Sequence, residues 1–93
     1  MSLLSENLRY LRAQKKCAQQ QVANDLIISR GRYSKYEDGK SEPPLEILKR
    51  ISVYYHVSID LMVSVDLTQI HAHDVMALEE KRMLLTELLN LHK

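Results

Sequence analysis

Residues 18–39 read AQQQVANDLIISRGRYSKYEDG, and this stretch decides how the chain folds. Val22 and Leu26 lie four positions apart, which gives residues 19–26 an apolar side at helical spacing. A second segment, residues 30–37, carries two tyrosines three positions apart, again at helical spacing. The pattern predicts two short helices joined by a tight turn.

The second helix of this pair has an aromatic side and a basic side. Ser29 precedes it and is a residue type favoured as a helix N-cap. We expect Tyr33 and Tyr36 to lie in the core, with their hydroxyls near the edge of the fold, rather than to stack on bases. The basic residues on the other side are Arg30, Arg32 and Lys35. A short helix with a basic outward face fits the major groove of DNA, so we favour a DNA-binding helix-turn-helix over a plain solvated face.

Apolar spacing predicts three further helices, and the composition favours an all-α fold. Two Gly and two Pro are few for a β-rich chain with many turns. Start signals precede these helices: Ser2 or Ser5, then Pro43 and Pro44, then Ser58. The first helix carries Leu4, Leu8 and Leu11, and the fifth covers residues 59–63. The fourth carries Leu45, Leu48, Ile51 and Tyr55, of which the first three are expected to lie in the core.

Length and charge restrict the class of protein. Ninety-three residues suit one small domain with an appendage, and a net charge of +1 provides no global basic field. The excess of Lys and Arg lies in residues 1–66. The single cysteine excludes an intrachain disulfide and suits a reducing compartment. Without an apolar run of membrane-spanning length or a signal peptide, we expect a cytoplasmic protein with no membrane contact.

The last part of the chain has a different pattern from the rest. We divide the chain into a helix-turn-helix DNA-binding domain, residues 1–66, and a C-terminal amphipathic helix, residues 67–93. Leucines at positions 84, 85, 88 and 89 cluster near the end of this helix, which cannot bury such a surface alone. The helix is expected to form a homodimer; docking of a protein partner and folding back onto the domain are the alternatives.

No group of side chains in the sequence indicates catalysis, a cofactor or a metal. His71 and His73 lie two apart and therefore do not share a helix face, and no further ligands complete a zinc site. Cys17 is interpreted as a small interior or helix-end residue rather than a redox sensor. Because no nucleophile, base and metal converge, we expect a protein that is not an enzyme and that uses no cofactor and no metal.

Four segments occur in order at the spacing of a known family. They are NLRYLR at 7–12, QQQVAN at 19–24, SRGRYSKYEDGK at 29–40 and PPLEILKRISVYYHVSIDLM at 43–62. Residues 8–62 resemble the helix-turn-helix domain of lambda-type phage repressors and XRE-type bacterial regulators. The resemblance implies a compact, five-helix, lambda-repressor-like fold that binds operator DNA as a dimer.

The resemblance also assigns roles to residues. Gln19 matches a glutamine that touches a phosphate and braces a base-contacting side chain. Arg12 and Glu37 match an Arg–Glu pair that joins the first helix to the third. The candidate DNA-binding residues are Gln19, Ser29, Arg30, Gly31, Arg32, Ser34, Lys35, Lys40 and Ser41. Among these, Arg30, Arg32 and Lys35 are expected to read base edges, and Lys40 and Ser41 to meet the DNA backbone.

Two positions depart from the family pattern. Ile27 occupies the turn position that is often Gly, and because a β-branched residue disfavours positive φ, we expect a different turn geometry. Gly31 stands where a base-reading side chain is common, and it weakens a helix by about 1 kcal/mol relative to Ala.

Together these observations predict a sequence-specific transcriptional regulator, a repressor that acts as a homodimer on double-stranded operator DNA. The alternative is a protein-interaction module or antitoxin-like regulator that binds a partner protein through residues 67–93.

Overall fold

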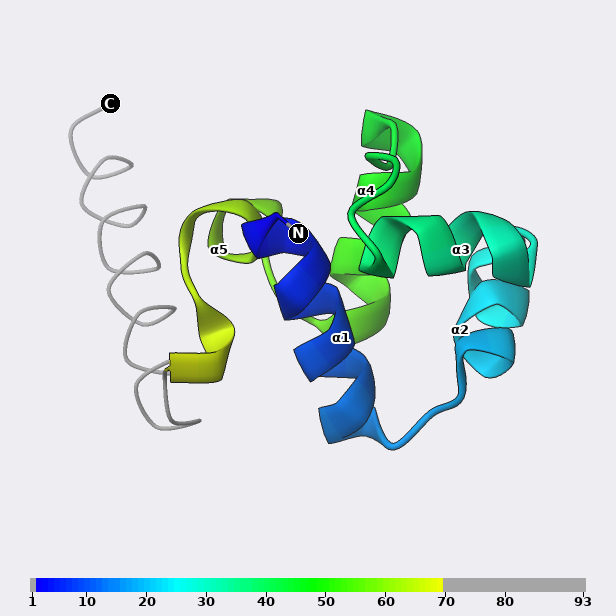
Figure 1. Ribbon diagram of the computed structural model, residues 1–93, viewed down its shortest axis with the longest axis horizontal. Helices are drawn as coiled ribbons and strands as arrows, with labels where there is room; N and C mark the ends of the chain where they lie inside the picture. The colour runs from blue at the N-terminus through cyan, green and yellow to red at the C-terminus, as the bar shows by residue number, and fades with distance from the viewer. Residues whose placement is uncertain (1, 70–93) are drawn as a thin grey trace, which may run out of the picture.

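The computed structural model describes residues 2–69, and every regular element in that range is helical (Figure 1). The elements are α1 (Leu3–Lys15), α2 (Gln19–Leu26), α3 (Arg30–Glu37), α4 (Leu45–Tyr55), α5 (Ile59–Ser64) and a short 3-10 turn, η1 (Leu67–Gln69). The predicted all-α fold with five helices is confirmed. Of the C-terminal helix expected at residues 67–93, the part from residue 70 onward, including both histidines of the HxH pair and the leucine cluster, lies outside the described residues.

Serine side chains determine where three of the helices begin. Ser2 accepts a hydrogen bond from the Ser5 N–H at 3.1 Å, and Ser29 accepts one from the Arg32 N–H at 3.1 Å. The Ser58 hydroxyl does the same for the Leu61 N–H at 3.2 Å. Each cap satisfies a first-turn N–H that has no helical partner, an interaction worth about 1 kcal/mol.

Three helices end in a left-handed residue that is not glycine. Lys16, Ile27 and His56 have φ of 59°, 61° and 57°. The expectation that Ile27 alters the turn was therefore wrong: it adopts the left-handed conformation, and its N–H bonds to the Asn24 carbonyl at 3.1 Å. Its side chain is 84% exposed, so the turn keeps its geometry without burying this β-branched residue.

The core fills the space between α1, α2, α3, α4 and α5. Its fully buried members include Leu8, Val22, Tyr33, Ile51 and Met62. We expected Leu45 to join them, and this was wrong because Leu45 is 61% exposed. The buried stripe of α4 runs instead along Ile47, Ile51 and Tyr55, which repeat every fourth residue, with Leu48 only partly buried beside it.

Helix α1 separates the two ends of the molecule. Figure 1 shows α3 on one side of α1, with α5 and η1 on the other, and α1 packs against all three. Asn7, which is fully buried, donates from Nδ2 to the carbonyls of Met62 and Val65, both at 2.7 Å, and accepts from the Leu67 N–H at 3.0 Å. The packed structure therefore reaches Leu67, which is 1% exposed. No helix within residues 2–69 is long and apolar enough to cross a membrane.

Candidate nucleic-acid interface

Helices α2 and α3 pack against each other and bury their inward side chains. Ala23 in the middle of α2 is fully buried, as is Tyr33 on α3. The connection takes only three residues, 27–29, because Ile27 turns the chain and Ser29 immediately caps α3. The pair is the helix-turn-helix predicted from residues 18–39.

A buried carboxylate joins the carboxyl end of α3 to α1 and α2. Glu37 is 1% exposed and accepts two hydrogen bonds from Arg12, from Nε at 2.7 Å and from Nη2 at 3.0 Å. The expected Arg12–Glu37 pair is therefore confirmed. Gln19 also donates to Glu37, from Nε2 at 3.1 Å, which places the start of α2 beside the end of α3.

This environment holds Glu37 in its charged form. Burial alone would raise the pKa of the carboxyl group, but hydrogen bonds from Arg12, Tyr33 and Gln19 outweigh it, so the pKa of Glu37 lies below its usual value. The two hydroxyls of Tyr33 and Tyr55 lie 2.7 Å apart and extend the same network into the core. The carboxylate thus fixes α3 rather than facing a ligand.

Three arginines are occupied by contacts with backbone carbonyls. Arg9 donates from Nε to the Glu37 carbonyl at 3.0 Å and from Nη2 to the Asp38 carboxylate at 2.7 Å. Arg50 donates to the Leu26 carbonyl at 3.2 Å, and Arg12 to the Cys17 carbonyl at 3.0 Å. The carbonyls of Glu37 and Leu26 lie at the carboxyl ends of α3 and α2, where helices leave them open, and that of Cys17 lies in the connection between α1 and α2. The three arginines therefore stabilise the fold.

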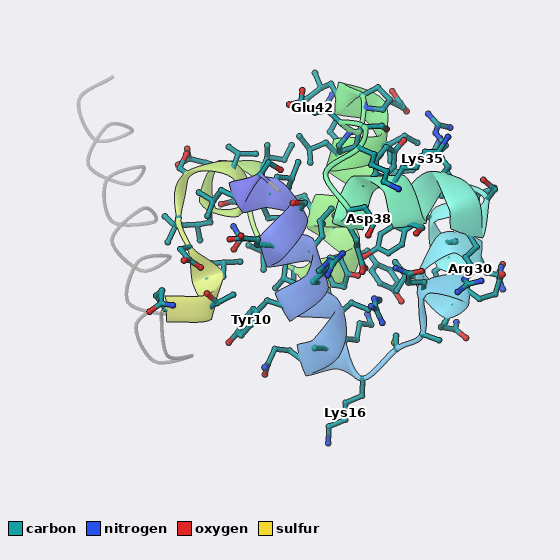
Figure 2. The ribbon with its side chains drawn as sticks, viewed as in Figure 1. Tyr10, Lys16, Arg30, Lys35, Asp38 and Glu42 are labelled. Carbon is teal, nitrogen blue, oxygen red and sulfur yellow. The ribbon has the colours of Figure 1, made fainter. Side chains whose placement is uncertain are left out.

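A second set of cations is exposed and unpaired within the described range. Arg30 and Lys35 lie on α3, and Figure 2 shows both side chains extending outward from that helix. Lys40 lies in the loop that follows, and within residues 2–69 none of the three side chains has a hydrogen-bond or ion-pair partner. The loop folds back on α3, because the N–H groups of Lys40 and Ser41 bond to the Lys35 carbonyl at 3.0 and 3.3 Å.

The remaining predicted residues of α3 differ in their surroundings. Arg32 is exposed, but its Nε donates to the Tyr36 hydroxyl at 2.8 Å. Ser34 is half-buried. Gly31 lies on the exposed side, and a Cβ placed there would meet nothing within 4 Å. The glycine is therefore not required by any contact among the described residues.

The nine candidate residues thus gather around α3. Eight lie between Ser29 and Ser41, and Gln19 joins them through Glu37. The sequence missed two contacts here, those of Gln19 with Glu37 and of Arg32 with Tyr36. The contact of Arg32 with Tyr36 could have been predicted, because residues four apart on a helix are neighbours.

No group of three His, Cys, Asp or Glu side chains that could hold a metal ion comes together within residues 2–69.

Comparison with known proteins agrees with this geometry. The family model HTH_3, described as helix-turn-helix, matches residues 8–62. The transcriptional activator BcrR of Enterococcus faecalis is 43% identical over 60 residues, 64% of this chain and 29% of that protein. The uncharacterized regulator YqaE of Bacillus subtilis is 43% identical over 61 residues, 66% of this chain and 53% of that protein.

A phage protein is also similar. The transcriptional repressor RstR of cryptic phage CTXphi in Vibrio cholerae is 32% identical over 62 residues, 67% of this chain and 56% of that protein. The chain thus spans about half or less of the length of these relatives. No solved structure matches the chain significantly. The family match begins within α1 and ends within α5 at Met62, so it includes the whole of α2, α3 and α4. The chain belongs to the XRE-type helix-turn-helix family.

Proposed function

We propose that this chain is a sequence-specific DNA-binding transcriptional regulator whose helix α3 enters the major groove. One observation carries the proposal: around α3, the cations of residues 2–69 differ in what they contact. Arg9, Arg12 and Arg50 donate to backbone carbonyls at helix ends or between helices, whereas Arg30 and Lys35 extend from α3 without a partner in the described part of the chain. Cations that contribute no internal contact are available for base edges and phosphates.

The contacts divide by position on the helix. Arg30, at the amino-terminal end of α3, suits the O6 and N7 acceptors of a guanine, and Lys35 reads a second base edge. Ser29, Ser34, Lys40 and Ser41 border this surface and contact the DNA backbone.

The start of α2 provides a further phosphate site. Its N-cap is Ala18, which makes no side-chain hydrogen bond. The first N–H groups of α2 therefore remain available for a phosphate oxygen, together with the second amide proton of Gln19. The contact of Gln19 with Glu37 supports this role, because it holds the glutamine at the edge of the reading surface.

We further propose that the protein represses transcription as a homodimer bound to operator DNA. One recognition helix makes few base contacts, so two half-sites about 34 Å apart strengthen and specify binding. The residues after 66 would form the dimer contact, and occupancy of a promoter would exclude polymerase. Among the similar proteins, the name of RstR states repression and that of BcrR states activation, so the direction of regulation is part of the test.

Selection of duplexes from a random library tests the proposal. The full chain should enrich one motif with two inverted half-sites, and sedimentation should show a dimer on it. Arg30→Ala should cost about 1–3 kcal/mol and relax preference at one base pair, whereas Lys40→Ala should weaken all duplexes and flatten the salt dependence. Lys49→Ala removes one exposed charge from α4 and is the matched control.

Three results would contradict parts of this proposal. No enriched motif, or an Arg30→Ala variant with unchanged affinity and preference, would remove sequence-specific reading by α3. A single half-site bound by a monomer would remove the homodimer. A reporter promoter that contains the motif should lose expression when the protein is supplied; a rise in expression would replace repression by activation.

A further inference from the structure

One arginine of α3 is held by the core rather than extended freely. The Arg32 Nε donates to the Tyr36 hydroxyl at 2.8 Å, one turn further along the helix. Tyr36 is 2% exposed and its ring belongs to the core, so the hydroxyl is a fixed point at the edge of the core. This bond uses only Nε, and both terminal nitrogens of Arg32 are without a partner within residues 2–69.

Arg32 also lies beside the outward side of α3 rather than on it. At about 100° per residue, Arg32 is ~80° around the helix from the midpoint between Gly31 and Lys35, on the flank that leads to Tyr36. Arg30 is ~120° from that midpoint on the opposite flank, but it lies at the amino-terminal end of α3, the end that contacts base edges. The bond to Tyr36 draws the guanidinium further toward the core. When a helix lies in a major groove, its outward side meets base edges, and its flanks face the sugar-phosphate strands that border the groove.

We propose that Tyr36 is a positioning residue that holds Arg32 against a DNA phosphate, so that this arginine clamps the backbone instead of reading a base. The two terminal nitrogens form the fork that binds phosphate oxygens in pairs. Because the side chain is oriented before DNA arrives, less of its freedom is lost on binding. The inference rests on the proposed DNA binding, and it replaces the base-reading role that the sequence predicted for Arg32.

The test compares the selected duplex with an unrelated duplex of equal length over a series of salt concentrations. Arg32→Ala should weaken both duplexes by a similar factor and lower the salt slope by about one. Tyr36→Phe, which removes only the hydroxyl, should weaken both about three- to tenfold. In an Arg32→Ala background the same change should have no further effect on binding, whereas a merely structural tyrosine would cost the same in both backgrounds.

Two further variants complete the design. Arg32→Lys keeps the charge but lacks the planar fork, so it should lose affinity like Tyr36→Phe while the salt slope stays near that of the unmodified protein. If thermal unfolding shows that Tyr36→Phe does not fold, the comparison of Arg32→Lys with Arg32→Ala replaces it as the test. Lys49→Ala should change neither affinity nor slope.

The possible failures are distinguishable. The inference is overturned if Arg32→Ala changes preference at a single base pair and spares the unrelated duplex, or if Tyr36→Phe has equal effects in both backgrounds. It is also overturned if both variants bind normally while Arg30→Ala and Lys35→Ala do not. If all four variants bind as the unmodified protein does, the proposed function itself fails.

Discussion

Replacing Ile27 by Gly should stabilise the protein. The left-handed conformation costs an L-residue about 1–2 kcal/mol, and Ile27 holds it with φ of 61° and ψ of 46°. Glycine removes this cost but loses about 0.5–1 kcal/mol through its greater freedom in the unfolded chain. The Ile27 side chain is 84% exposed, so little burial is lost. The net expectation is a gain of about 1 kcal/mol, or about 4–8 °C in Tm for a domain of this size.

Urea and thermal unfolding of the full chain measure this gain. Val53→Gly is the matched control, because Val53 is also β-branched and 73% exposed but lies inside the right-handed helix α4. That substitution should destabilise the protein by a few tenths of a kcal/mol, since glycine is a poorer helix residue than valine. If Ile27→Gly leaves the free energy of unfolding unchanged or lowers it, or if both variants change it in the same direction, the left-handed conformation of Ile27 does not strain the protein.

Two other substitutions test the recognition helix and its anchor. Gly31→Ala should raise the free energy of unfolding by about 1 kcal/mol, because a Cβ there meets nothing within 4 Å, and should weaken DNA binding if the helix backbone approaches the groove at this point. Unchanged affinity would show that the groove leaves room for a methyl group. Glu37→Gln should cost about 1–3 kcal/mol at pH 7 through its weakened bonds to Arg12. Because the pKa of Glu37 is lowered in the folded state, its stabilisation is complete above the unfolded value of about 4.3 and is lost as the pH falls through the folded value. Urea unfolding between pH 7 and pH 3 should therefore show a steeper loss for the unmodified protein than for Glu37→Gln, and parallel curves would contradict the assignment.

Local signals in the sequence were sufficient to locate the helices. Ser29 and Ser58 cap the helices that they were expected to cap, and α2 and α3 have the predicted bounds. These features depend on residues within one helical turn of each other, which the sequence displays directly. The pairing of Arg12 with Glu37 spans 25 residues, and it came from the resemblance to a family rather than from spacing.

What the sequence could not show depends on contacts between distant elements. Asn7 bonds to groups 55 to 60 residues away, and nothing near it indicates this. Leu45 was expected to be buried because it fits a helical spacing, but α4 is rotated so that Ile47 faces the core. At Ile27, the need to connect α2 and α3 in three residues overrides the preference of a β-branched side chain.

The arrangement of charges explains how a chain with a net charge of only +1 could present a positive surface to DNA. Two carboxylates, Glu37 and Asp38, lie at the end of α3 and would repel phosphates if left unpaired. Arg12 neutralises the first at 2.7 Å and Arg9 neutralises the second at 2.7 Å. An exposed ion pair adds little to stability, so the Arg9–Asp38 contact, with side chains 47% and 34% exposed, matters more for the local field than for the fold. With both carboxylates compensated, Arg30, Lys35 and Lys40 outnumber Glu42, the remaining carboxylate of α3 and its following loop that has no ion pair among the described residues. The total charge of the chain therefore says little about DNA binding here, because what matters is the local balance of charge on α3 and its following loop.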